Sequence, residues 1–128
     1  MDAVVLLELE EYIYLTTVYK GDGNGEDICH ICNKVLAKVT HGDRIYFKAD
    51  NKIVGYSTRA DWHNIDEDEQ NILNGRLWQH IGRSIVYWNR MYWYKEPIEY
   101  KKRMKLFGVR YFDLQKVLKG KREPEIKE

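Results

Sequence analysis

Residues 39–58 read VTHGDRIYFKADNKIVGYST, and this stretch contains the clearest secondary-structure signal of the chain. The Gly-Asp pair at 42–43 predicts a turn that leads into a strand of apolar and aromatic residues over 44–49. The Asp-Asn pair at 50–51 suits the two-residue turn of an antiparallel hairpin, and the partner strand follows over 52–58. We therefore predict a β-hairpin and arrange the other elements around it.

The sequence before the hairpin predicts a strand, a loop and a helix. Residues 3–19 are rich in Val, Leu, Ile, Tyr and Thr and roughly alternate, which favours a long strand that is bent or broken at 10–11. Three glycines at alternate positions within 20–27 indicate a loop. Apolar residues recur every three or four positions from 28 to 39, which is typical of a short amphipathic helix.

The chain after the hairpin is first polar and then strongly aromatic. Residues 61–80 contain clustered acidic side chains and predict a polar segment with a short helix. Residues 84–94 are rich in Ile, Val, Tyr and Trp, so they predict a long strand, which we expect Pro97 to end. Both faces of this strand carry rings, and we expect both faces to be covered.

The last third of the chain is basic. Residues 98–104 predict a helix or a linking segment, and residues 106–112 predict a short strand or turn. Asp113 is placed to cap a final helical turn over 114–118.

Length and composition limit the organisation of the chain. Its 128 residues fit one domain, which we expect to span 1–120, with a charged tail at 121–128 that frays. Apolar residues make up 44% and charged residues 32%, which favours a packed core over disorder. No apolar run approaches the ~20 residues that cross a bilayer, and no secretory signal opens the chain. We therefore predict a cytoplasmic protein without membrane contact.

The net charge of +1 conceals an asymmetry between the two parts of the chain. Residues 1–86 carry 9 basic and 14 acidic side chains, a net charge of −5. Residues 87–128 carry 12 basic and 6 acidic side chains, a net charge of +6. Such a split predicts either a basic face for an anionic partner or a solvated tail of mixed charge.

The two cysteines, Cys29 and Cys32, form a single Cys-x-x-Cys motif. A structural zinc site commonly needs two such pairs, and the histidines do not recur at zinc-finger spacing. A redox pair needs the motif at the start of a helix that follows a strand, and this alternative stays open. Our interpretation is two half-buried thiols, and we predict neither a metal nor a cofactor.

The hairpin and its flanks resemble the PUA-like superfamily, with the EVE and ASCH branches closest. In that superfamily a helix leads into a Gly-Asp turn like the one at 42–43, then a strand like 44–49, then a second strand with Val-Gly, as at 54–55. The Tyr-Lys-Glu-Pro-Ile run at 94–98 is similar to the EVE strand that ends in a Pro-aliphatic step before a basic helix. The likeness covers roughly residues 28–112.

The resemblance implies an α+β fold, namely a PUA-like pseudo-barrel of about five to six mostly antiparallel strands with short helices. It also implies binding of RNA or DNA, and several branches flip a modified base into an aromatic pocket. Rings stack on extruded bases while Lys and Arg hold phosphates. We therefore predict a non-enzymatic nucleic-acid-binding module, with RNA ahead of DNA, that reads a modified or extruded base in an aromatic-lined cleft.

The candidate contacts to nucleic acid combine rings with the cations that follow them in the chain. They are Tyr56, Arg59, Trp62, Trp88, Arg90, Lys101, Lys102, Arg103, Lys105 and Arg110.

Two other classes of function stay open. ASCH-like hydrolases act on modified nucleosides and need Lys, Thr and Glu close together, for which Lys20, Thr17 and Glu26 are the candidates; we assign no catalytic residue. The other alternative is a protein-interaction or homodimer domain, in which the aromatic stretch at 84–94 is an interface.

Overall fold

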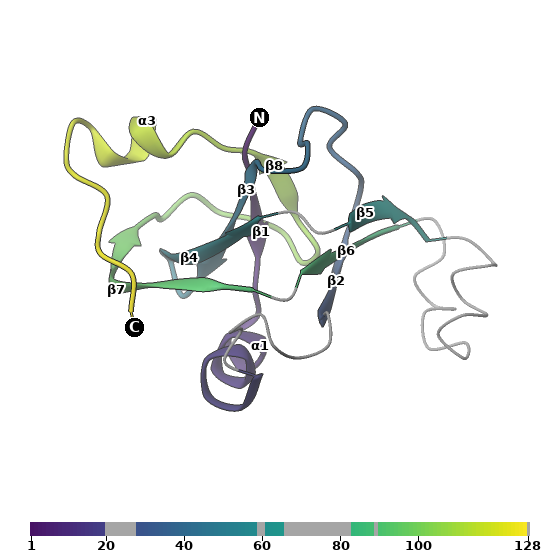
Figure 1. Cartoon of the computed structure of the whole chain (residues 1–128), viewed down its shortest axis with the longest axis horizontal. Coiled ribbons are helices and arrows are strands. Elements are labelled where there is room, and N and C mark those ends of the chain that lie inside the picture. Colours follow the sequence, from purple (N-terminus) through teal and green to yellow (C-terminus); the bar gives the residue numbers. More distant parts are fainter. Residues whose placement is uncertain (20–27, 59–60, 66–82, 89, 128) are drawn as a thin grey trace.

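In the part of the chain that the structure describes, two β-sheets and three short helical elements form an α+β fold (Figure 1). The computed structural model describes residues 1–19, 28–58, 61–65, 83–88 and 90–127. Among the helices of these ranges, none combines the length and the apolar composition that a bilayer crossing requires.

The larger sheet has five strands in the order β7-β4-β3-β1-β8. β1 runs parallel to β3, and the other neighbouring strands are antiparallel. The strands are β1 (Ala3–Leu6), β3 (Arg44–Ala49), β4 (Lys52–Thr58), β7 (Tyr92–Glu99) and β8 (Val109–Tyr111).

The predicted hairpin is confirmed as β3 and β4, which pair antiparallel from Arg44 opposite Thr58 onward. Asp50 and Asn51 have φ angles of 51° and 59°, the left-handed pair that a two-residue hairpin turn requires. Gly55 lets β7 approach β4, because a Cβ at this position would collide with the carbonyl oxygen of the neighbouring strand.

The smaller sheet has three antiparallel strands in the order β2-β6-β5. They are β2 (Ile28–Cys32), β6 (Ser84–Trp88) and β5 (Asp61–Asn64). The helix predicted over 28–39 is therefore wrong, because the first residues of that range pair with β6 and the rest form turns. Three apolar residues of this range, Cys32, Leu36 and Val39, are buried nevertheless.

The long strand predicted over 3–19 is also wrong beyond Leu6. Helix α1 (Leu9–Tyr14) and the π-helical turn η1 (Leu15–Tyr19) follow β1, and α1 lies below the sheet in Figure 1. Tyr12 meets the Trp93 ring edge-on at 5.6 Å, so tertiary packing stabilises a helix where the sequence alternates.

The aromatic stretch at 84–94 is divided between the two sheets and is not one strand. β6 ends at Trp88 and β7 begins at Tyr92 in the other sheet. The buried Ser57 hydroxyl donates to the carbonyl oxygen of Arg90 and fixes the chain at this crossing. Pro97 does not end β7, because β7 is an edge strand, where the missing N–H of Pro is tolerated.

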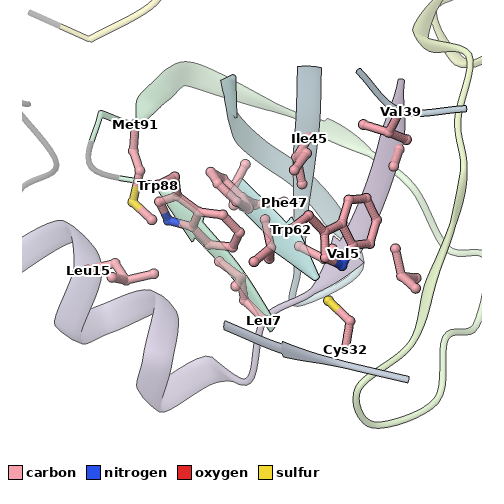
Figure 2. Packing of buried hydrophobic residues seen from close by; sticks show 14 of the residues in the cluster. Val5, Leu7, Leu15, Cys32, Val39, Ile45, Phe47, Trp62, Trp88 and Met91 are labelled. Carbon is pink, nitrogen blue, oxygen red and sulfur yellow. The ribbon is translucent and has the colours of Figure 1, made fainter. Parts of the chain in front are cut away.

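One cluster of buried apolar residues joins the two sheets (Figure 2). Phe47 of β3 lies 5.0 Å from the Trp88 ring of β6 and 5.6 Å from the Trp93 ring of β7. Trp62 of β5 belongs to the same cluster. The interior between the sheets is therefore filled with side chains.

A second buried cluster covers the opposite face of the larger sheet. Helix α3 (Leu114–Leu118) lies on this face and is capped as predicted, because the Asp113 carboxylate accepts a hydrogen bond from the Gln115 N–H at 3.0 Å. The C-terminal tail, which we expected to fray over 121–128, is hydrogen-bonded to β7. The N–H of Lys95 donates to the Glu125 carbonyl at 2.8 Å, and Tyr94 forms an antiparallel β-bridge with Ile126.

Candidate nucleic-acid interface

The two tryptophans proposed as base-stacking residues lie in the core. Trp62 is 3% exposed and Trp88 is 1% exposed. Figure 2 shows both indoles surrounded by side chains that include Val5, Leu7 and Phe47. In this conformation neither indole offers a face to a base, so these rings contribute to stability.

Tyr56 and Arg90 belong to a stacked row of side chains on the outer face of β4 and β7. The Arg44 guanidinium lies 4.0 Å from the Tyr56 ring centroid. The Tyr56 ring stacks on Tyr92 at 5.0 Å and 23°, and the Arg90 guanidinium lies 5.3 Å from the Tyr92 ring. The Tyr56 and Tyr92 rings are therefore already stacked against each other and against the two arginines.

The positive charge of Arg44, at one end of this row, is neutralised by Glu123 of the C-terminal tail. Arg44 donates to the Glu123 carboxylate at 2.7 Å, and the Tyr94 hydroxyl donates to the same oxygen at 2.6 Å. Burial raises the pKa of Tyr94, and the bond to Glu123 raises it further. A pocket of about 370 Å³ at this place is also lined by Asp2 and Asp113, so its mixed charges do not favour an anion.

A different pocket combines rings with cations that have no carboxylate partner among the described residues. Its volume is about 440 Å³, and it lies between the segment after β7, the strand β8 and helix α3. We call it the aromatic pocket. Its rings are Tyr100, Tyr111 and Phe112, its cations are Lys102, Arg110 and Lys116, and Met1, Asp113 and Val117 complete the lining.

The rings of the aromatic pocket are held in defined positions. Tyr100 meets Phe112 edge-on at 5.4 Å and 88°, and both are half-buried in the second cluster. Tyr111 is 37% exposed, and its hydroxyl accepts a hydrogen bond from the Lys38 N–H at 3.1 Å. Tyr111 therefore combines a fixed position with an accessible ring, which a stacking platform needs.

A second pocket of about 340 Å³, the basic pocket, adjoins the aromatic pocket through Arg110, which lines both. Its cations are Lys34, Arg103, Lys105 and Arg110, and Asn33, Met104, Gly108 and Val109 complete the lining. The two pockets therefore meet at Arg110, and basic residues line both of them.

Backbone hydrogen bonds hold the basic segment against the rest of the fold. The Tyr100 N–H donates to Asn51 at the hairpin turn, and the Asn33 N–H donates to Phe107, each at 2.8 Å. The Arg110 guanidinium donates to the carbonyl oxygen of Arg103 at 2.7 Å. The segment predicted as a helix or a link is therefore an extended connection with fixed ends.

The charge of this surface is largely uncompensated. Lys101 pairs with Glu99 at 3.0 Å, and both side chains are exposed. Within the ranges that the structure describes, Lys102, Arg103, Lys105 and Lys116 form no ion pair. Asp113 is the acidic side chain of the aromatic pocket, and its carboxylate already accepts the capping hydrogen bond.

The structure thus brings together Lys102, Arg103, Lys105 and Arg110 from the predicted set and separates them from the buried tryptophans. Arg59 lies outside the described residues. The sequence analysis missed the four residues Tyr100, Tyr111, Phe112 and Lys116. The signal was present, because Tyr100 directly precedes and Tyr111 and Phe112 directly follow the basic run at 101–110.

Among the described side chains, the residues considered for enzymatic activity do not come together in one site. Lys20 and Glu26 lie outside the described residues, and the Thr17 hydroxyl of η1 donates to the Ile13 carbonyl of the preceding helix α1 at 2.6 Å. Cys32 is fully buried on strand β2, where burial, with Glu11 adding, raises the pKa of its thiol to about 12. A thiol of this kind is protonated and poorly nucleophilic.

Comparison of the chain with protein-family models, with curated proteins and with solved structures found no match.

Proposed function

We propose that this protein is a non-enzymatic nucleic-acid-binding module whose binding surface is formed by the aromatic and basic pockets. The observation that carries the proposal is the lining of the aromatic pocket, where three aromatic and three basic residues line one volume of about 440 Å³. Cations attract the phosphate backbone and release its counterions, and rings stack on unpaired bases. An open pocket with both groups favours a single strand over a duplex.

The proposal includes a PUA-like pseudo-barrel and a preference for RNA over DNA, both of which rest on the sequence resemblance. Two sheets that share one apolar cluster are compatible with such a fold. The base-reading position, however, moves from the buried tryptophans to Tyr111 and its neighbours in the aromatic pocket.

Fluorescence anisotropy with labelled single-stranded oligonucleotides tests the proposal, using RNA and DNA of one sequence. A ligand that contacts about four phosphates should show a slope of about −3 in the logarithm of affinity against the logarithm of salt concentration. Between about 50 and 200 mM salt the affinity should then fall about 50-fold. Absence of binding at low salt contradicts the proposal.

A pair of charge variants locates the binding surface. Lys102→Gln combined with Lys116→Gln removes two exposed cations of the aromatic pocket. Lys121→Gln combined with Lys127→Gln removes the same charge from exposed positions of the C-terminal tail, outside both pockets. We expect the first double variant to flatten the salt slope by about 1.4 and the second to leave it nearly unchanged. Equal effects of the two variants would show attraction by overall charge only.

A further inference from the structure

The aromatic pocket contains one side chain that phosphate binding does not explain, namely Asp113. Asp113 is exposed, and it is the acidic residue among the described ones that line this pocket. Its Oδ1 atom accepts the Gln115 N–H and caps α3, while Oδ2 has no partner within the part of the chain that the structure describes. Serine or asparagine caps a helix about as well without a charge that repels phosphate. The cap therefore does not require the negative charge, which remains available to a ligand.

Arg110 and Asp113 give the aromatic pocket two ends of opposite charge. The pocket shares Arg110 with the basic pocket, and it shares Asp113 with the mixed-charge pocket of about 370 Å³. The chain between the two residues is extended, because Tyr111 belongs to β8 and the Phe112 N–H donates to the Asp2 carbonyl at 3.0 Å. Three residues of extended chain span about 10 Å. The cationic end therefore lies roughly this far from the acidic end.

A single nucleotide has the matching polarity, because its phosphate is an anion and the edge of its base lies beyond the sugar, a comparable distance away. Guanine presents two adjacent N–H donors on its Watson–Crick edge, at N1 and N2, and a carboxylate accepts two parallel hydrogen bonds. Adenine and cytosine present one amino group beside an acceptor nitrogen, and uracil presents one N–H between two carbonyls. Each of these three bases therefore brings a lone pair against the carboxylate, and guanine fits best.

We propose that the aromatic pocket selects guanine, with Asp113 accepting hydrogen bonds from the N1–H and the N2 amino group of the base while Arg110 binds the phosphate of the same nucleotide. This inference rests on the proposed function and makes guanine-containing single strands the preferred ligands. The partly exposed ring of Tyr111, which lies between the two charged residues in the chain, stacks on the base. Lys102 and Lys116 attract neighbouring phosphates without regard to sequence.

Calorimetric titration of the full chain with GMP, IMP, AMP and UMP tests the selection. IMP has the ring system of GMP and lacks the N2 amino group, so it isolates one of the two bonds. We expect GMP to bind at least about tenfold more tightly than AMP and UMP, and at least about fivefold more tightly than IMP. Equal affinities for the four nucleotides, or no measurable binding of GMP, overturn the inference.

Asp113→Asn removes the charge and keeps a side chain that caps a helix, so we expect the fold to be retained. The variant should prefer GMP over AMP by less than about twofold, and its affinity for AMP should not fall, because a charge that repels phosphate is gone. A purely structural role of Asp113 would lower all four affinities alike. A variant that keeps the wild-type preference for GMP overturns the assignment to Asp113.

Two further variants serve as controls. Glu125→Gln removes one acidic charge from an exposed position outside the aromatic, basic and mixed-charge pockets, and it should leave the preference for GMP unchanged. Arg110→Gln should weaken the binding of all four nucleotides and keep their order, because Arg110 binds the phosphate that they share. If Glu125→Gln abolishes the preference as Asp113→Asn does, overall charge governs it and the assignment to Asp113 is overturned.

The outcomes separate this inference from the proposed function. Binding of long single strands that depends on Lys102 and Lys116, together with equal affinities for GMP and AMP, overturns the guanine pocket and keeps the proposed function. Conversely, selective binding of GMP by a protein that binds no oligonucleotide supports the guanine pocket and contradicts the proposed function.

Discussion

Rings gather in two regions of this molecule, and their surroundings are opposite. Between the sheets, the Phe47 ring packs against both Trp88 and Trp93, and all three are almost completely buried. In the aromatic pocket, Tyr100 and Tyr111 are partly exposed and lie beside lysine and arginine side chains. The number of rings in a sequence is therefore a poor guide to a binding surface, because most of a protein's large rings can lie in its core.

The two arginines nearest to these regions support the same distinction. Arg44 stacks on Tyr56 and pairs with Glu123, so the protein itself satisfies its charge and its planar face. Arg110 donates to a backbone carbonyl and faces two pockets. Charge that the fold leaves uncompensated is the charge that remains for a ligand.

The largest expected effect separates the two regions by stability. Trp88→Ala should lower the free energy of unfolding by about 3–5 kcal/mol, because it removes a buried ring beside Phe47. Tyr111→Ala should cost less than about 1 kcal/mol, because the ring is partly exposed. Urea denaturation followed by circular dichroism measures both. Similar losses for the two variants would remove the distinction between a core and a binding region.

The second expected effect separates the regions by affinity. Tyr111→Ala should weaken binding of single-stranded RNA by about 1–3 kcal/mol, the value of one stacked base. Trp88→Phe, which keeps a ring in the core, should bind RNA as the wild type does. The comparison is made by anisotropy at constant salt. A folded Trp88→Phe protein that loses RNA binding would show that the indole reaches the ligand.

The smallest expected effect tests how well the core is sealed, through the pH dependence of stability. Burial raises the pKa of the Cys32 thiol to about 12 in the folded state, above its ordinary value of 9.0. The unfolded chain therefore loses this proton first, so the stabilising contribution is complete below about pH 8 and declines as the pH rises toward 12.

Cys32→Ala is the matched variant for this test. Between about pH 9 and pH 10 the wild type should lose about 1 kcal/mol more stability than the variant, as measured by urea denaturation at each pH. Other ionising groups are common to both proteins and cancel in the difference. Parallel pH profiles would mean that the Cys32 thiol is open to water.

Local signals predicted the parts of the fold that local interactions determine. The Asp50-Asn51 turn fixes the β3–β4 hairpin through two left-handed residues, and Asp113 fixes the start of α3 through one hydrogen bond. Neither feature depends on distant parts of the chain, so the sequence predicted both.

The errors occurred where a local pattern fits two structures and distant contacts decide. Residues 9–19 roughly alternate as in a strand, yet Leu15 packs into the core from a helical segment. The apolar spacing after Ile28 suits a helix, yet this segment pairs with β6. In both places the partner is far away in sequence, and a single chain does not reveal it.

The candidate site was predicted in its charge and only partly in its rings. The basic segment that contains Lys102, Arg103 and Lys105 does form a surface with unpaired cations. The tryptophans were taken as the stacking candidates and Tyr111 was not considered, although large rings near strands more often fill a core. Burial of a ring depends on how the two sheets pack, which no local pattern specifies.

One measurement tests the central claim most directly, namely a backbone and indole chemical-shift map recorded while single-stranded RNA is added to ¹⁵N-labelled protein. The account predicts that amide signals of residues 100–117 shift, with the largest changes at Tyr111 and Phe112, while the indole N–H signals of the buried Trp62, Trp88 and Trp93 stay in place. Shifts concentrated on those indoles, with residues 100–117 unaffected, would contradict it.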